Sequence, residues 1–212
     1  MKVSKKVAGV EYAIRDIVSA AREIEKQGKT VDYLNIGDPV QFGFQPPENV
    51  KRALINAVND GNNFYTQSEG LPELLNAIAK KENSKGLSIS SEHVIVTNGV
   101  SEGLDMIISS IVEDGDEVLL PGPYYPPYAS YVRLHGGKPI EFEVDLETSQ
   151  PNIDDLKSKI SSKTVAICLI TPNNPTGLIF NEKSLKEIVD IANEHDLYII
   201  CDEIYDKIVF DE

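Results

Sequence analysis

Two stretches of this sequence decide the fold: VAICLITPNNPTG at residues 165–177 and LYIICDEIY at residues 197–205. Each begins with an apolar run, Val165–Ile170 and Leu197–Cys201, that is too continuous for a strand with one face in solvent. Such runs are typical of buried strands in a parallel sheet. Polar residues follow each run at once, and ligands of open α/β sheets bind at the carboxyl ends of the strands. The sequence therefore predicts a parallel sheet with a binding site at this edge.

From residue 93 onward strands and helices alternate, which predicts an α/β domain whose parallel strands are joined by crossover helices. Apolar residues at helical spacing predict helices around Leu104–Val112 and Leu185–Ala192. Before residue 93 the pattern is mainly helical, with apolar stripes over Ile14–Ile24 and Val50–Val58. A Gly- and Pro-containing loop is expected between these two stripes. The expected strands are His93–Thr97, Glu117–Leu120, Pro139–Val144, Val165–Ile170 and Leu197–Cys201.

Composition narrows the class of protein. With 212 residues, 41% of them hydrophobic, the chain can bury a substantial core. Its formal charge of -14 opposes binding to nucleic acid or to an anionic membrane surface. The basic start is not followed by an apolar stretch long enough for a signal peptide or a membrane span, so we expect a cytoplasmic protein. Cys168 and Cys201 lie in apolar strands without CxxC or Cys/His spacing, so neither a disulfide nor a metal site is expected.

An acidic residue directly after an apolar strand, such as Asp202, occurs in several kinds of protein. A nucleotide hydrolase also carries an acidic pair after such a strand, but it needs a phosphate-binding loop. The only candidate, Gly28-Lys29-Thr30, lacks the earlier glycine, because Glu23 occupies that position. An acid that caps a neighbouring helix, or that pairs with a surface cation, remains an alternative.

Gly99, Val100 and Ser101 follow an expected strand and open an expected helix. The N-terminus of a helix presents free N–H groups and partial positive charge, which suits an anion such as phosphate. Gly99 permits a tight turn, and Ser101 could both cap the helix and bond a phosphate oxygen. The spacing is not GxGxxG, so a dinucleotide site has little support. A plain helix cap is the alternative.

Six motifs occur in a fixed order along almost the whole chain. Together they resemble the N-terminal half of the class I and II pyridoxal-phosphate-dependent aminotransferases, the fold-type-I family that includes aspartate and alanine aminotransferases. The resemblance implies an N-terminal arm and small-domain segment at residues 1–45, followed by an incomplete cofactor-binding large domain at residues 46–212. The motifs are NIGDP at 35–39, YTQSEG at 65–70, TNGVSE at 97–102, PGPYYP at 121–126, NPTG at 174–177, and Asp202 with Tyr205.

The resemblance assigns three residues to the cofactor ring. Asp202 is expected to keep the ring nitrogen protonated, because a nearby carboxylate favours the cationic form. Asn174 and Tyr205 are expected to donate hydrogen bonds to the ring oxygen. Turn chemistry is the alternative role of Asn174, and a core position is the alternative role of Tyr205.

The remaining implied roles concern the phosphate, the ring face and the substrate. The phosphate is expected at Gly99–Ser101, and Tyr125 is expected to stack on the cofactor ring. Tyr65 is expected to reach the phosphate of a partner subunit in a homodimer, and Gly37 to lie near the substrate carboxylate. A core position is the alternative for either tyrosine, and a turn glycine for Gly37.

The chemistry also needs a lysine that binds the cofactor covalently and moves a proton. Lys163, in Ser161-Ser162-Lys163-Thr164, superficially resembles the lysine of the family's Ser-x-Ser-Lys-Thr motif. It precedes the strand at 165–170, whereas the family lysine follows the strand that ends in the aspartate, so we expect Lys163 to be an exposed loop residue. Because no other lysine matches and the chain stops just after an apolar stretch, we expect a longer protein and an inactive segment. The substrate-binding arginine is expected outside this stretch as well, since Arg15, Arg22, Arg52 and Arg133 do not match it.

The expected activity of the complete protein is the transfer of an amino group between an amino acid and a 2-oxo acid. Two alternatives stay open: a lyase of the same fold that uses the same cofactor, and a noncatalytic half-length binding module.

Overall fold

The computed structural model describes residues 4–8, 13–34 and 37–210, and these form two compact units. One unit contains the residues up to Val18 and those from Asn98 onward, and the other is Ser19–Thr97. The division near residue 45 that the sequence suggests stays a prediction. The first two residues of the NIGDP motif, Asn35 and Ile36, lie outside the described residues, as do Asp211 and Glu212.

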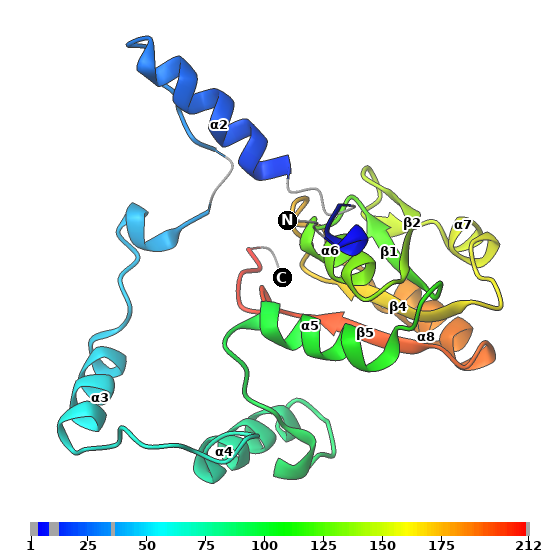
Figure 1. Cartoon of the computed structure of the whole chain (residues 1–212). Helices are drawn as coiled ribbons and strands as arrows, with labels where there is room; N and C mark the ends of the chain where they lie inside the picture. Colours follow the sequence, from blue (N-terminus) through cyan, green and yellow to red (C-terminus); the bar gives the residue numbers. More distant parts are fainter. Residues whose placement is uncertain (1–3, 9–12, 35–36, 211–212) are drawn as a thin grey trace. The chain divides into compact units, whose positions relative to one another are not determined.

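A five-stranded sheet in the order β3-β2-β1-β4-β5 forms the centre of the first unit (Figure 1). The pairs β1–β2, β1–β4 and β4–β5 are parallel, whereas the short β3 is antiparallel to β2. The prediction of an α/β domain with a mostly parallel sheet is therefore confirmed. The strands are β1 (Glu117–Gly122), β2 (Lys138–Asp145), β3 (Gln150–Pro151), β4 (Thr164–Ile170) and β5 (Tyr198–Asp202).

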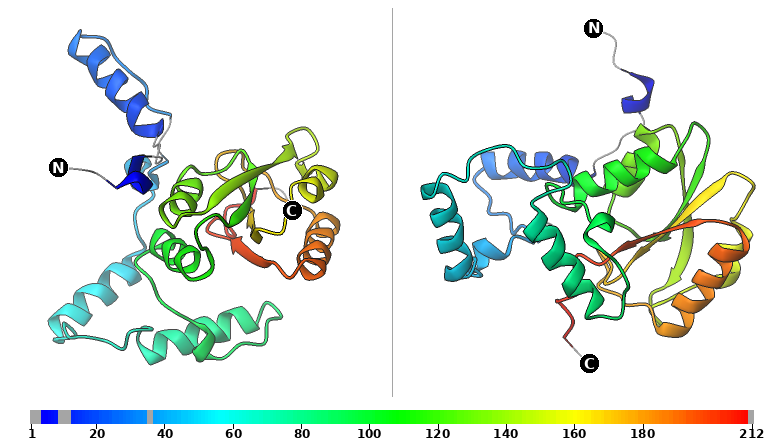
Figure 2. Two further views of the ribbon diagram at one scale, coloured as in Figure 1. Left: turned by 45° about the vertical axis from the view of Figure 1, so that its right-hand side comes forward. Right: turned by 90° about the horizontal axis from the view of Figure 1, so that it is seen from below.

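Helices cover both faces of this sheet, with α5 and α6 on one face and α7 and α8 on the other (Figure 2). Successive residues of β4 point to opposite faces, so that Cys168 joins the first core and Leu169 joins the second. Because both faces are buried, the strands need continuous apolar runs, and this accounts for the sequence pattern. The helices are α5 (Val100–Ile111), α6 (Pro127–Leu134), α7 (Ile153–Ser158) and α8 (Glu182–Glu194).

The expected strand at His93–Thr97 is wrong. His93 ends a short 3-10 helix, η2 (Ser91–His93), and residues 94–97 have no regular structure. Val94 packs with Leu75 and Ala79 on α4. The Val96 amide donates a hydrogen bond to the Glu69 carbonyl at 2.8 Å. A strand requires a ladder of such bonds, and the described residues offer this segment no neighbouring strand. Its β-branched residues therefore indicate an extended segment that is not part of the sheet.

Helices dominate the second unit, as the sequence predicts. The helices of the N-terminal part are α1 (Lys5–Ala8), α2 (Ala13–Lys26), η1 (Pro39–Phe42), α3 (Glu48–Asn59) and α4 (Pro72–Asn83). The glycines that follow α2 and α3, Gly28 and Gly61, both have φ of +80°, which suits glycine at the end of a helix. No helix among the described residues has the length and apolar character needed to cross a bilayer.

Two neighbouring isoleucines of α5 provide a matched test of this packing. Ile108 is fully buried between α5 and the sheet, whereas Ile107 is 44% exposed. Ile108→Ala should lower the free energy of unfolding by about 2–5 kcal/mol, because it leaves a cavity in the core. Ile107→Ala removes the same atoms from a more exposed site and should cost much less. Chemical denaturation of both variants measures the difference, and equal losses would contradict the placement of α5.

Candidate functional site

The carboxyl ends of β4 and β5 lie side by side. Ile170, the last residue of β4, is in register with Asp202, the last residue of β5. Beyond this pair the Thr171 amide donates to the Asp202 carbonyl at 3.1 Å, so the backbones stay together past the end of β4. The turn that contains Asn174 therefore starts directly beside Asp202.

A closed turn follows β4 and carries Asn174. The Gly177 amide donates to the Asn173 carbonyl at 2.8 Å, and the Asn173 amide donates to the Leu178 carbonyl at 3.0 Å. Gly177 has φ of +72°, a conformation that residues with a side chain rarely adopt. The turn holds Asn174 in a half-buried position at the sheet edge.

Asn173 joins this turn to the end of β1. Its side-chain Nδ2 donates to the Pro123 carbonyl at 3.1 Å, and the residue is only 4% exposed. Its Oδ1 is buried and has no hydrogen-bond partner among the described residues. The sequence analysis assigned no role to Asn173, because a contact with a residue 50 positions away leaves no local pattern.

The segment after β1 brings Tyr125 toward the same edge. Residues 123–126 lead from β1 into α6, and the half-buried ring of Tyr125 packs against the core that α5 and α6 form with the sheet. Because Asn173 bonds the backbone of Pro123, this segment and the turn of Asn174 are held together.

Asp202 receives hydrogen bonds from two neutral donors. The Tyr128 hydroxyl donates to Oδ2, and the Ile204 amide donates to Oδ1 at 3.0 Å. None of the ion pairs among the described residues includes Asp202. The carboxylate is thus oriented by the protein without being neutralised by a cation of the described chain. The alternative of a surface ion pair is not observed in the part of the chain that the structure describes.

Two buried groups near Asp202 stay uncharged. Burial, and then the hydrogen bond to Asp202, raise the pKa of the Tyr128 phenol. Burial, and then the charge of Asp202, raise the pKa of the Cys168 thiol. The protonated phenol can donate but cannot compete with Asp202 for a cation, and the sequence analysis did not single out this tyrosine.

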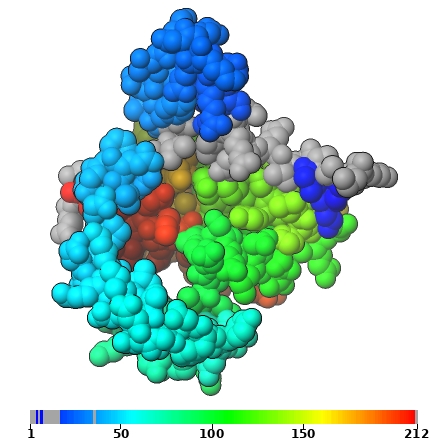
Figure 3. Space-filling model, turned by 60° about the vertical axis from the view of Figure 1, so that its left-hand side comes forward, coloured from blue at the N-terminus to red at the C-terminus, as the bar shows by residue number. Residues whose placement is uncertain are grey.

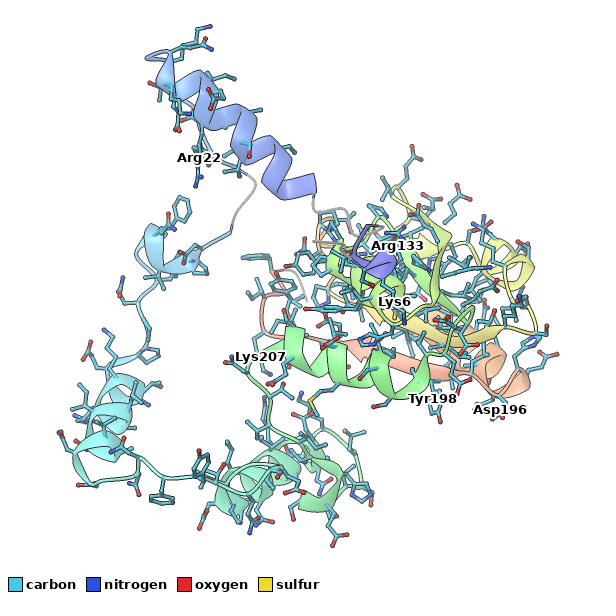
Figure 4. The ribbon with its side chains drawn as sticks, in the orientation of Figure 1. Lys6, Arg22, Arg133, Asp196, Tyr198 and Lys207 are labelled. Atoms are coloured by element: carbon cyan, nitrogen blue, oxygen red, sulfur yellow. The ribbon has the colours of Figure 1, made fainter. Side chains whose placement is uncertain are left out.

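Tyr205 lies in the turn that follows β5. Residues 204–207 form this turn, in which Tyr205 is half-buried and its carbonyl accepts a hydrogen bond from the Ile208 amide at 2.8 Å. Lys207 in the same turn and Tyr198 at the start of β5 lie at opposite ends of the strand (Figure 4). Tyr205 is therefore at the Asp202 end of β5.

The start of α5 differs in one detail from the expectation. Gly99, with φ of +80°, is the N-cap residue and has no side chain with which to cap the helix. Ser101 is the second residue of the helix and is exposed, so the predicted capping by Ser101 is wrong; the helix already begins at Val100. The Glu102 carboxylate accepts a hydrogen bond from the Asn98 amide just before the helix.

Helix α5 packs on the same core as β4 and β5. Leu104 packs in one buried cluster with Ile170, Ile200 and Tyr128. The segment after β5, in red, and the region of α5 and α6, in green, are exposed on one face in Figure 3. The first unit thus carries Asn174 and Asp202 at or just beyond the carboxyl ends of β4 and β5, Tyr205 in the turn after β5, and the N-terminus of α5.

Of three other residues from the sequence analysis, one lies at the opposite end of β4 and two belong to the second compact unit. Lys163 is exposed in the turn before β4, at the opposite end of that strand from Asn174, and this confirms the expectation of a loop residue. Tyr65 is fully exposed between α3 and α4, and Gly37 is exposed just before η1. Both belong to the second compact unit, and their roles stay predictions.

Comparisons with known proteins show the family of this chain. The family model for aminotransferase class I and II matches residues 30–212. The chain is 40% identical, over 98% of its length, to a glutamate–pyruvate aminotransferase of Haemophilus influenzae, and 38% identical, over 99%, to an alanine aminotransferase of Mycobacterium tuberculosis. It spans about half the length of these curated relatives, 52% and 49% respectively.

Solved structures give the same result. An alanine aminotransferase from Pyrococcus furiosus matches the whole chain with a TM-score of 0.96 and 49% identity, and the chain covers 54% of it. An aspartate aminotransferase variant from Thermus thermophilus also matches the whole chain, with a TM-score of 0.93 and 33% identity, and is covered to 56%. With its sheet, its motifs and these relatives in agreement, the chain belongs to the aminotransferase class I and II family.

Proposed function

We propose that the protein containing this chain is a pyridoxal-phosphate-dependent aminotransferase, which transfers an amino group between an amino acid and a 2-oxo acid. Family membership supports this proposal, as do the relatives named as glutamate–pyruvate and alanine aminotransferases. The observation that carries it is the Asp202 carboxylate, which is held at the sheet edge by neutral donors and lacks a cationic partner among the described residues. We further propose that the protein is a cytoplasmic homodimer.

The chemistry of the donor set fits the cofactor. A carboxylate without a counter-ion is suited to a cationic pyridine nitrogen, because the two charges favour each other. The start of α5 presents the backbone N–H groups of a helix N-terminus behind a glycine N-cap, which suits a phosphate. Glu102 in the first turn is the one unfavourable charge there, and its carboxylate is engaged by the Asn98 amide.

Each candidate residue then has one task. Asp202 holds a proton on the ring nitrogen, and Asn174 and Tyr205 donate hydrogen bonds to the ring oxygen. The bound cofactor supplies an electron-withdrawing ring that stabilises negative charge on the substrate's α carbon. The protein's own contribution is to keep that ring protonated and oriented while the reaction proceeds.

The other candidates bind the periphery of the cofactor and the substrate. Gly99, Val100 and Ser101 bind the phosphate through the start of α5, and Tyr125 stacks on the ring. Gly37 lies by the substrate carboxylate, and Tyr65 of the partner subunit reaches the phosphate. The lysine that binds the cofactor has no candidate in this stretch, so we propose that the stretch alone is inactive.

An amino-transfer assay tests the activity itself. Full-length protein with pyridoxal phosphate, alanine and 2-oxoglutarate should form glutamate and pyruvate in equal amounts; aspartate is the second amino donor to test. Chromatography of both products measures the stoichiometry. Keto acid formed without a new amino acid would instead indicate a lyase, and neither product with any donor would contradict the proposal.

Asp202→Asn in the full-length protein tests the ring-nitrogen role. The amide keeps the shape but loses the charge, so turnover should fall about 100-fold or more, whereas cofactor affinity should change less. Glu203→Gln, which removes the same charge from the next residue, is the matched control and should remain close to the unaltered protein. Steady-state kinetics and equilibrium dialysis measure the two effects; similar turnover for both variants would refute the role.

Tyr205→Phe tests the hydrogen bond to the ring oxygen. An oxygen that loses a donor holds its proton to higher pH, so the pH at which the bound cofactor changes colour should rise by about one unit. Tyr198→Phe, at the other end of β5, removes an exposed hydroxyl and should leave that pH unchanged. Absorbance titration reads both variants, and an unmoved midpoint in Tyr205→Phe would count against the assignment.

Mixed dimers test whether Tyr65 acts across subunits. A dimer with Tyr65→Phe in one chain and Asp202→Asn in the other should keep one site with unaltered cofactor affinity, because the Tyr65→Phe chain receives the partner's intact tyrosine. With both substitutions in one chain, the site of the unaltered chain should bind the cofactor more weakly. Cofactor titration of the active site separates the two arrangements, and the reverse pattern would place Tyr65 in its own subunit's site.

A further inference from the structure

Tyr128 connects α6 to the end of β5 through the interior of the protein. Its side chain is 1% exposed, and its hydroxyl donates to Oδ2 of Asp202, 74 residues further along the chain. The ring packs with Cys168 on β4 and Ile200 on β5 in the core between the sheet and α6. The hydroxyl is therefore fixed by the packing of its ring, which leaves the phenol little freedom to turn away.

This contact engages one of the two carboxylate oxygens of Asp202. The Ile204 amide, two residues along the chain, donates a hydrogen bond to one carboxylate oxygen. This bond is part of the local turn after β5. The other oxygen is held by Tyr128 alone among the described side chains. A carboxylate bonded at one oxygen can rotate about its side-chain torsions, whereas one bonded at both oxygens by separate elements is fixed.

The chemical type of the donor matters as much as its position. A lysine or arginine here would form an ion pair and neutralise the negative charge that a cationic ligand needs. A phenol gives a strong hydrogen bond to a carboxylate and adds no charge. Because burial and Asp202 both raise the pKa of Tyr128, the phenol remains neutral and its hydroxyl remains a donor.

We propose that Tyr128 is a positioning residue, which holds the Asp202 carboxylate in place for the cationic ring nitrogen of the cofactor. This inference rests on the proposed function, since it requires that Asp202 binds that nitrogen. Tyr128 does not touch the cofactor in this scheme and acts only through Asp202.

The same tyrosine could have a purely structural role as part of the core. In that case the ring would provide the stabilisation and the hydroxyl would be incidental. Tyr128→Phe separates the two roles, because it keeps the ring and removes only the hydroxyl. Tyr131→Phe is the matched control: Tyr131 lies one turn later on α6, is half-buried, and packs against the same core.

The experiment uses full-length protein loaded with pyridoxal phosphate that carries 15N at the ring nitrogen. In Tyr128→Phe the ring nitrogen should lose its proton at a pH about one unit lower than in the unaltered protein, and cofactor affinity should fall about tenfold. Tyr131→Phe should match the unaltered protein in both measurements. The 15N chemical shift follows protonation directly and does not depend on turnover.

A double-mutant cycle tests whether Tyr128 acts through Asp202. In the Asp202→Asn background the charge is already gone, so Tyr128→Phe should cause no further change in cofactor affinity or in the 15N shift. An equal loss in both backgrounds would overturn the proposal, and so would an unmoved 15N titration in Tyr128→Phe alone. If the unaltered protein fails to bind the cofactor, or binds it with a neutral ring nitrogen, the proposed function fails together with this inference.

A measurement on the unaltered side chain covers the case in which Tyr128→Phe does not fold. The Tyr128 hydroxyl proton should exchange with water far more slowly than that of the exposed Tyr198, because it is buried and bonded to Asp202. Proton NMR of the cofactor-free full-length protein reads both. Equally rapid exchange would show that the bond is absent and would overturn the proposal.

Discussion

The parallel pairing of β1, β4 and β5 is the constraint on which the rest of the structure depends. In a parallel sheet every strand ends at the same edge, so the chain leaves each strand among residues that are distant in sequence. The register between Ile170 and Asp202 determines which residues are neighbours at this edge, because it makes the turn of Asn174 start beside Asp202. A shift of one residue would point Asp202 to the opposite face of the sheet, away from Tyr128.

Charge gives this edge its chemical character. The chain carries 34 acidic and 20 basic residues, so a carboxylate that needed a cation would have few to choose from. The acidic partners of the lysine ion pairs lie at other positions, mostly on the surfaces of helices, where such pairs contribute little to stability. Asp202 is instead half-buried and held by neutral donors, which costs solvation and leaves its charge available. A protein that only had to fold would gain nothing from this arrangement.

Sequence patterns predicted the parts of the fold that a short window can encode. The continuous apolar runs located β4 and β5, and the helical spacing located α5 and α8, because burial determines both patterns. Residues 94–97 show the limit: their composition favours a strand, but a strand exists only beside a partner, and no described residue provides one. The same limit applies at the site. Polar residues after apolar strands pointed to Asn174 and Asp202, whereas Tyr128 and Asn173 act through contacts 74 and 50 residues away, which no spacing rule detects.

Asn173 shows that a long-range contact can matter to the site as much as the residues that would bind a ligand. Loops at a sheet edge lack the ladder that holds the strands, and their relative positions must be fixed by individual hydrogen bonds. Asn173 provides one between the segment of Tyr125 and the turn of Asn174, and it is buried although one of its polar atoms has no partner among the described residues. Leaving a buried oxygen unsatisfied is unfavourable, so packing alone does not account for an asparagine at this position. Its hydrogen bond joins the two loops and so limits how far the neighbouring Asn174 can move relative to the segment of Tyr125.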